Sequence, residues 1–123
     1  MQIWLDDNRD PTNPDIQAKY PSARYYAWTW VKTVPEAKQY IERGEVDAIS
    51  FDNDLGLPEE GKHLATWIED KAYYNKIKPM EWYVHSENSV AKDEIIAAMR
   101  NADKFWEQHR TACIDWHGLA RCS

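Results

Sequence analysis

Long apolar runs are absent from this chain of 123 residues, and a membrane span needs about 18 consecutive apolar residues. The N-terminus also lacks the basic and then apolar segment of a secretory signal peptide, so we expect a cytoplasmic protein. Cysteine is scarce, because Cys113 and Cys122 are the only two and cannot build a disulfide framework. No internal repeat, low-complexity segment or linker divides the chain, and its length fits one domain.

Positive charge is the next shortage, with 15 lysines and arginines against 21 aspartates and glutamates and a net charge of −6. A protein that binds nucleic acid broadly needs a basic face to pair with the phosphates. We therefore exclude a broad nucleic-acid-binding face, and we expect no membrane partner. A small phosphorylated ligand or a single RNA end, held by a few local groups or by a metal, stays compatible with this charge.

The chain does contain two alternating kinds of apolar pattern. Short apolar or aromatic runs typical of strands occupy residues 1–5, 24–33, 46–51 and 81–84. Helical spacing occupies residues 16–20, 62–74 and 90–99, and the Thr33 cap predicts one more helix, closed by Gly44. Strands that alternate with helices indicate a parallel α/β sheet. The pattern weakens after Arg100, so we place the domain at residues 1–100 and a C-terminal extension, packed on it, at residues 101–123.

Tryptophan is unusually frequent, with seven copies in the chain. Large aromatic side chains dominate the energetics of small cores, so core positions are their commonest role. The alternative is that one of them lies near a site and stacks on a base. We expect core positions for Trp28, Trp30, Trp67 and Trp82.

Polar side chains follow three of the predicted strands, at the point where each strand ends. Because the carboxyl ends of parallel strands meet at one edge of a sheet, where ligands bind, we expect these side chains to converge. They are Asp6, Asp7, Asp52, Asn53, Asp54, His85, Ser86, Glu87 and Asn88. Clustered carboxylates repel one another unless a cation or protons intervene, and oxygen ligands suit Mg²⁺ or Mn²⁺. The predicted metal ligands are Asp6, Asp7, Asp52 and Asp54.

A divalent cation at that edge could hold a phosphate, polarise it and activate water. His85 could move a proton near neutral pH, and Ser86 could donate a hydrogen bond to a phosphate oxygen. The Arg9 guanidinium could pair with phosphate through two hydrogen bonds. The structural alternative for each acid is that it caps a helix or forms a turn. The predicted catalytic residues are His85, Asp52 and Ser86, and the predicted substrate-binding residues are Arg9, Asn88 and Asn53.

The last part of the chain carries four side chains of the types that bind metals, His109, Cys113, His117 and Cys122. Their spacing is loose, and no Cys-x-x-Cys unit is present, which makes a zinc site the least favoured alternative. A disulfide between the two cysteines and a packed tail are the other two alternatives.

The order of strand ends resembles the receiver domains of response regulators, in which an acidic pair and a central Asp hold Mg²⁺ and accept a phosphoryl group. The chain resembles the cyclic-phosphate processing receiver-like family more closely. That family shows Leu-Asp-Asp-x-Arg-x-Pro, then Ser-x-Asp-His-Asp-Leu-Gly, a Gly-started helix with a Trp-Ile ending, and His-Ser-x-Asn-Pro-x-Gly. The matching segments here are residues 5–11 (LDDNRDP), 50–56 (SFDNDLG), 61–69 (GKHLATWIE) and 84–90 (VHSENSV).

This resemblance implies a small three-layer, flavodoxin-like α/β domain with a mainly parallel sheet. No clear fifth strand with the receiver lysine follows Met99. It also implies processing of a cyclic phosphate on a nucleotide, an RNA end or ADP-ribose, with His85, Ser86 and Asn88 as partners of the phosphate. The chain departs from the family at Asn53, where His is common, and at Ser89 and Ala91, which replace Pro and Gly.

We therefore expect a divalent-metal-dependent cyclic phosphodiesterase that hydrolyses a cyclic phosphate. Two alternatives remain open. One is a non-catalytic module that binds a nucleotide or a partner protein. The other is a signalling receiver phosphorylated on Asp52, against which the missing lysine strand weighs.

Overall fold

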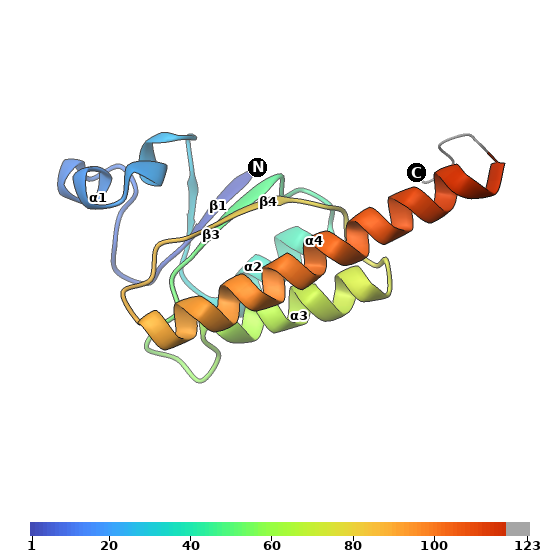
Figure 1. Ribbon diagram of the computed structural model, residues 1–123. Coiled ribbons are helices and arrows are strands. Elements are labelled where there is room, and N and C mark those ends of the chain that lie inside the picture. Colours follow the sequence, from blue (N-terminus) through green and yellow to red (C-terminus); the bar gives the residue numbers. More distant parts are fainter. Residues whose placement is uncertain (118–123) are drawn as a thin grey trace.

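The computed structural model describes the backbone of residues 1–117 and the side chains of residues 1–111. Four parallel strands form one sheet in the order β2-β1-β3-β4, and no fifth strand occurs within residues 1–117 (Figure 1). The strands are β1 (Gln2–Leu5), β2 (Thr29–Val31), β3 (Ala48–Phe51) and β4 (Glu81–Val84). The helices are α1 (Pro14–Lys19), the 3₁₀ helix η1 (Pro21–Arg24), α2 (Val34–Glu42), α3 (Gly61–Tyr73) and α4 (Ser89–His117). The predicted parallel α/β fold is confirmed.

The local signals of the sequence account for most of these boundaries. The Thr33 hydroxyl oxygen accepts a hydrogen bond from the Glu36 N–H at 3.3 Å and caps α2, as predicted. Gly44 ends the same helix with φ +72°, a conformation that suits glycine. The prediction for β4 matches its observed bounds, and α3 differs from its predicted range by one residue at each end.

The second predicted strand is wrong for residues 24–28. Arg24 ends η1, and strand pairing is confined to Thr29–Val31. Aromatic residues are common in strands, but the rings before Thr29 pack on one another instead. The Tyr26 and Trp28 rings meet edge to face at 5.2 Å, and Trp28 also contacts Tyr83 of β4. Contacts between rings, and not backbone pairing, therefore account for the aromatics of this segment.

The two faces of the sheet are covered differently. Helices α2, α3 and α4 lie against one face, where Ile3, Leu5, Ile49 and Phe51 of the strands join the helix side chains in the main core (Figure 1). Alternation along β1 turns Trp4 to the other face, where its ring lies 5.8 Å from that of Trp28. The short α1 and η1 and the aromatic segment after them lie on that second side.

Core positions for the four named tryptophans are only partly confirmed. Trp67 and Trp82 are half-buried and pack against the main core, and Trp28 and Trp30 are half-buried outside it. Each indole N–H needs an acceptor, which keeps a ring near polar groups. Trp82, for example, donates to the Asp103 carboxylate at 2.9 Å. The deeply buried tryptophans among the described side chains are Trp4 and Trp106.

Helix α4 crosses residue 100 without a break. Ala102 and Trp106 lie on its buried stripe and join the main core. Nε2 of His109 lies 3.0 Å from the carbonyl oxygen of Ala72 and 2.9 Å from that of Tyr73, at the end of α3. The side chains of Cys113, His117 and Cys122 lie outside the described residues, so the alternatives for the tail stay predictions.

Candidate metal centre

The carboxyl edge of the sheet is set by backbone pairing that continues one residue beyond each strand. The Asp6 N–H donates to the Val31 carbonyl at 3.0 Å, and the Asp52 N–H donates to Leu5 at 2.9 Å. The His85 N–H donates to the Phe51 carbonyl at 2.9 Å. Between β1 and β3 the order of the strands reverses, and ligands of open α/β sheets bind at that switch point. The sheet therefore places Asp6 and Asp52 where this fold class binds its ligands.

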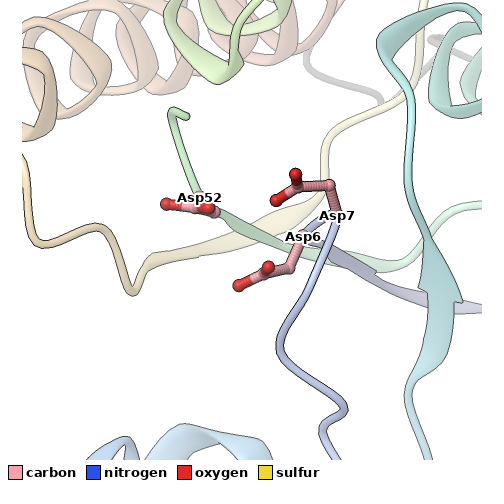
Figure 2. A group of neighbouring side chains, drawn as sticks. All are labelled: Asp6, Asp7 and Asp52. Carbon is pink, nitrogen blue, oxygen red and sulfur yellow. The ribbon is translucent and has the colours of Figure 1, made fainter. Parts of the chain in front are cut away.

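Three carboxylates converge there. One oxygen from each of Asp6, Asp7 and Asp52 lies within 4.8 Å of the other two. Figure 2 shows the three carboxylates pointing to the same side, from the segment after β1 and from the end of β3. Asp6 and Asp52 are buried, and Asp7 is exposed. A hollow of about 360 Å³ opens beside them, lined by Asp7, Asn8, Arg9, Asp52, Asp54 and Glu87.

Asp6 is fully buried, and four donors surround its carboxylate. Oδ1 accepts hydrogen bonds from the backbone N–H groups of Asn8 and Arg9, both at 2.9 Å. Oδ2 lies 3.1 Å from Nε2 of His85 and 3.4 Å from Nη1 of Arg9. Burial alone raises the pKa of Asp6, but these hydrogen bonds outweigh burial and hold the pKa below its usual value. Asp6 is therefore ionised at neutral pH.

Asp52 is also buried, but fewer hydrogen-bond donors surround its carboxylate than surround that of Asp6. Its Oδ1 accepts a hydrogen bond from the Asn53 N–H at 2.8 Å, and its Oδ2 lies 3.4 Å from Nη1 of Arg9. Burial and the negative charge of Asp6 raise the pKa of Asp52 to about 6, although Arg9 opposes the change. The ionised carboxylate thus lacks part of the positive charge that it needs, and a cation would supply it.

His85 lies behind Asp6 and not in the hollow. Its ring stacks on Trp4 with centroids 3.8 Å apart, and its Nδ1 lies 2.7 Å from the Ser50 hydroxyl. Burial lowers the pKa of His85, against the opposing effect of Asp6. A neutral ring that accepts from Ser50 at Nδ1 donates from Nε2 to Asp6. Both ring nitrogens are engaged inside the protein.

The segment from Asp6 to Arg9 is pinned by two indoles. The Trp30 N–H donates to the Asp6 carbonyl at 2.6 Å, and the Trp4 N–H donates to the Arg9 carbonyl at 3.0 Å. Both tryptophans come from neighbouring parallel strands, β1 and β2. The aromatic second face of the sheet therefore holds the backbone that carries two of the three carboxylates.

The remaining predicted residues build the loops of the site. Asn53 is buried; its amide donates to Glu60 at 2.9 Å, and its Oδ1 accepts from the Lys62 N–H at 3.0 Å. Asn88 caps α4, since its Oδ1 accepts from the Ala91 N–H at 3.1 Å. The Ser86 hydroxyl oxygen accepts from the Asn88 N–H at 3.2 Å. Asp54 lines the hollow but stands outside the group of three carboxylates.

Sequence reasoning missed several residues that shape this site. Ser50 and Trp4 hold His85, and Glu87, which was expected at this edge but given no role, lines the hollow. Gly61 lets α3 start against the site, because a Cβ there would lie 2.0 Å from the Asp52 carbonyl oxygen. A signal for Ser50 existed, since it is the one polar residue in the apolar run that forms β3. The other three depend on contacts between distant segments.

A larger hollow of about 1110 Å³ lies at the opposite, amino end of the sheet. Asp47, Ile77 and Trp106 are among the residues that line it. It contains none of the residues predicted for the site. None of the helices in the described part of the chain is long and apolar enough to cross a bilayer.

The comparison with protein families covers the part of the chain that carries the three carboxylates. Residues 1–101 match the family described as the cyclic-phosphate processing receiver domain. The chain belongs to this family. The match spans all four strands and the first turns of α4. No curated protein and no solved structure matches the chain.

The donor set of this receiver domain suits a hard divalent cation. All three candidate ligands are carboxylates, and Mg²⁺ and Mn²⁺ prefer oxygen. Asp7 on the open side leaves room for water or a ligand oxygen to complete the coordination, as catalytic sites require. His85 donates a hydrogen bond to Asp6 from outside the hollow. Carboxylates that bind metals are commonly oriented by such hydrogen bonds from residues that do not touch the metal. The cluster could therefore bind a metal ion.

Proposed function

We propose that this domain hydrolyses a cyclic phosphate on a nucleotide, an RNA end or ADP-ribose, and that Asp6, Asp7 and Asp52 hold the Mg²⁺ or Mn²⁺ that it uses. The observation that carries the proposal is the convergence of three strand-end carboxylates, within 4.8 Å, beside a hollow at the switch point of the sheet. Family membership supports the class of substrate.

The metal would polarise the phosphate and lower the pKa of a bound water. The chain's own residues contribute in different ways. Asp52 and Asp6 provide buried negative charge for the cation, and Asp7 provides a ligand that reaches the open side of the hollow. The hollow has a volume of about 360 Å³, which leaves room for a phosphate beside the three carboxylates. Arg9 is the cationic side chain on its lining, and we assign it to the phosphate.

His85 has two possible roles that an experiment separates. If His85 is the predicted proton donor or acceptor, its replacement by alanine lowers kcat about 10²–10⁴-fold while metal affinity stays the same. If His85 instead positions Asp6, the same replacement weakens metal binding about 10–100-fold. We favour positioning, because both ring nitrogens already bind protein groups. Titration of Mn²⁺ into the His85→Ala variant decides between the two roles.

Phosphorus NMR tests the proposed function directly. The panel holds 2′,3′-cyclic nucleotides, 3′,5′-cyclic nucleotides and ADP-ribose 1″,2″-cyclic phosphate, with Mg²⁺ or Mn²⁺. We expect a new phosphomonoester signal that disappears with chelator and with Asp52→Asn. The matched control is Asp15→Asn, which removes an exposed carboxylate on α1 outside the hollow and should leave the rate unchanged.

Two results would replace the proposal. Line broadening without conversion would indicate a module that binds nucleotides without turnover. A labile acyl phosphate on Asp52 after incubation with acetyl phosphate, with no conversion of any cyclic phosphate, would indicate a phospho-acceptor receiver.

A further inference from the structure

The guanidinium of Arg9 lies where the two buried carboxylates of the site meet. Its Nη1 is 3.4 Å from Oδ2 of Asp6 and 3.4 Å from Oδ2 of Asp52. These are two of the three side chains whose oxygens converge as candidate metal ligands. In the protein without a cation, Arg9 therefore supplies the positive charge that both carboxylates share.

The backbone of Arg9 is held in place by two hydrogen bonds. The Arg9 N–H donates to Oδ1 of Asp6 at 2.9 Å, and its carbonyl accepts from the Trp4 indole at 3.0 Å. The side chain, in contrast, is 25% exposed and borders the hollow. Rotation about the side-chain torsions can therefore move the guanidinium while its anchor stays in place.

Two weaker partners of the Arg9 guanidinium lie at the rim of the hollow. Nη2 of Arg9 lies 3.6 Å from the exposed carboxylate of Glu87, and the guanidinium carbon lies 5.7 Å from the centre of the Tyr20 ring. Glu87 is itself held by Lys19 and by the Tyr20 hydroxyl, the latter at 3.1 Å. The guanidinium thus has contacts toward the open side as well as toward the buried carboxylates.

A divalent cation and this guanidinium compete for the same two carboxylates. Mg²⁺ binds oxygen at about 2.0–2.1 Å, and two positive charges on one pair of carboxylates repel each other. Oδ2 of Asp6 already accepts from His85 as well as from Arg9, so little room remains for a third partner. The longer of these two contacts, from Arg9 at 3.4 Å, is the one that can open.

We propose that the metal and Arg9 exchange on Asp6 and Asp52. Binding of the cation displaces Nη1, and the freed guanidinium turns into the hollow and pairs with the anionic phosphate of the ligand. This inference rests on the proposed metal site and adds an order of binding: the cation binds first and frees the Arg9 guanidinium, which then binds the phosphate. Metal and phosphate then strengthen each other's binding, and by linkage the coupling is equal in both directions.

Isothermal titration with Mn²⁺ tests the exchange in the wild-type protein, Arg9→Gln and Lys19→Gln. The Lys19 variant is the matched control, because Lys19 contacts Glu87 at the rim and not the carboxylate cluster. We expect Arg9→Gln to bind Mn²⁺ about 5-fold more tightly than wild type or better, and Lys19→Gln to change the affinity much less. The Arg9→Lys variant serves in its place if Arg9→Gln does not fold, and a shorter side chain should also tighten Mn²⁺ binding.

Side-chain NMR of the wild-type protein gives a second readout that needs no variant. Titration with Mg²⁺ alone should shift the Nε–Hε signal of Arg9, with the other arginines as internal references. Addition of inorganic phosphate should shift it again only when Mg²⁺ is present. Equal Mn²⁺ affinities in Arg9→Gln and Lys19→Gln, with an Arg9 signal that Mg²⁺ does not move, would overturn the exchange and leave the metal site intact. Absence of Mn²⁺ binding in the wild-type protein would instead overturn the proposed function itself.

Discussion

Replacing Asp52 by asparagine should make the metal-free protein more stable and should abolish metal binding. Asp52 is 2% exposed, and burial together with Asp6 raises its pKa from 3.8 to about 6. Asparagine has nearly the same shape, keeps an oxygen for the Asn53 N–H, and carries no charge to desolvate. The wild-type carboxylate therefore lowers the stability of the metal-free protein, as expected if the proposed metal ion neutralises it.

The size and the pH range of the effect follow from the two pKa values. A change from 3.8 to about 6 corresponds to about 3 kcal/mol at pH 7, where the carboxylate is ionised in both states. The folded state holds the proton more tightly, so the penalty is absent below the unfolded value and grows as the pH rises from about 4 to about 6. Allowing for relaxation in the folded state, we expect a gain of about 1–3 kcal/mol, or roughly 4–12 °C in Tm.

Urea unfolding of both proteins in chelator, at pH 4.5 and at pH 7, measures this difference. The other ionisable groups are the same in both proteins, so subtraction isolates Asp52. With saturating Mg²⁺ the wild type should regain stability by mass action while Asp52→Asn does not. A variant that is less stable than wild type at pH 7, or a stability difference that is equal at the two pH values, would refute this account of the buried carboxylate.

Three further predictions concern the same edge of the sheet. The affinity for Mn²⁺ should fall about tenfold per pH unit below about pH 6, where Asp52 takes up a proton, and a flat titration series from pH 5 to 7 would contradict this. Gly61→Ala should cost about 1–3 kcal/mol and weaken Mn²⁺ binding, because its Cβ would meet the Asp52 carbonyl, whereas Gly44→Ala should cost about 1 kcal/mol and spare the site. Asn88→Ala should lower the unfolding free energy by about 1 kcal/mol, because it removes the cap of α4, and should leave the Mn²⁺ affinity unchanged. A loss of Mn²⁺ affinity together with the loss of stability would give Asn88 a role in the site.

Much of the fold could be predicted because its local signals agree with the tertiary structure. The run before His85 is apolar and bounded by Pro79, and it forms β4 as predicted. The segment before Thr29 could not be predicted in the same way, since aromatic rings favour both strands and packed turns. Helix α4 extends through residues whose pattern is weak alone, because α3 offers a long apolar face against which they pack.

The candidate site divides along the same line. Asp6, Asp7 and Asp52 could be grouped from the sequence, because parallel strands bring their carboxyl ends to one edge. The positions of Asn53 and Asn88 within their loops could not be derived, since an amide after a strand serves a ligand and a helix cap equally well.

The sequence by itself determined the fold class, the family and the three carboxylates, because each depends on a local pattern or on a rule that holds for every parallel sheet. Only the tertiary structure decided how those carboxylates differ. Asp6 and Asp52 both follow buried strands, yet the pKa of Asp6 is lowered and that of Asp52 is raised. The physical reason is that hydrogen bonds and charge depend on distances between residues far apart in the chain, such as His85 and Asp6 at 3.1 Å.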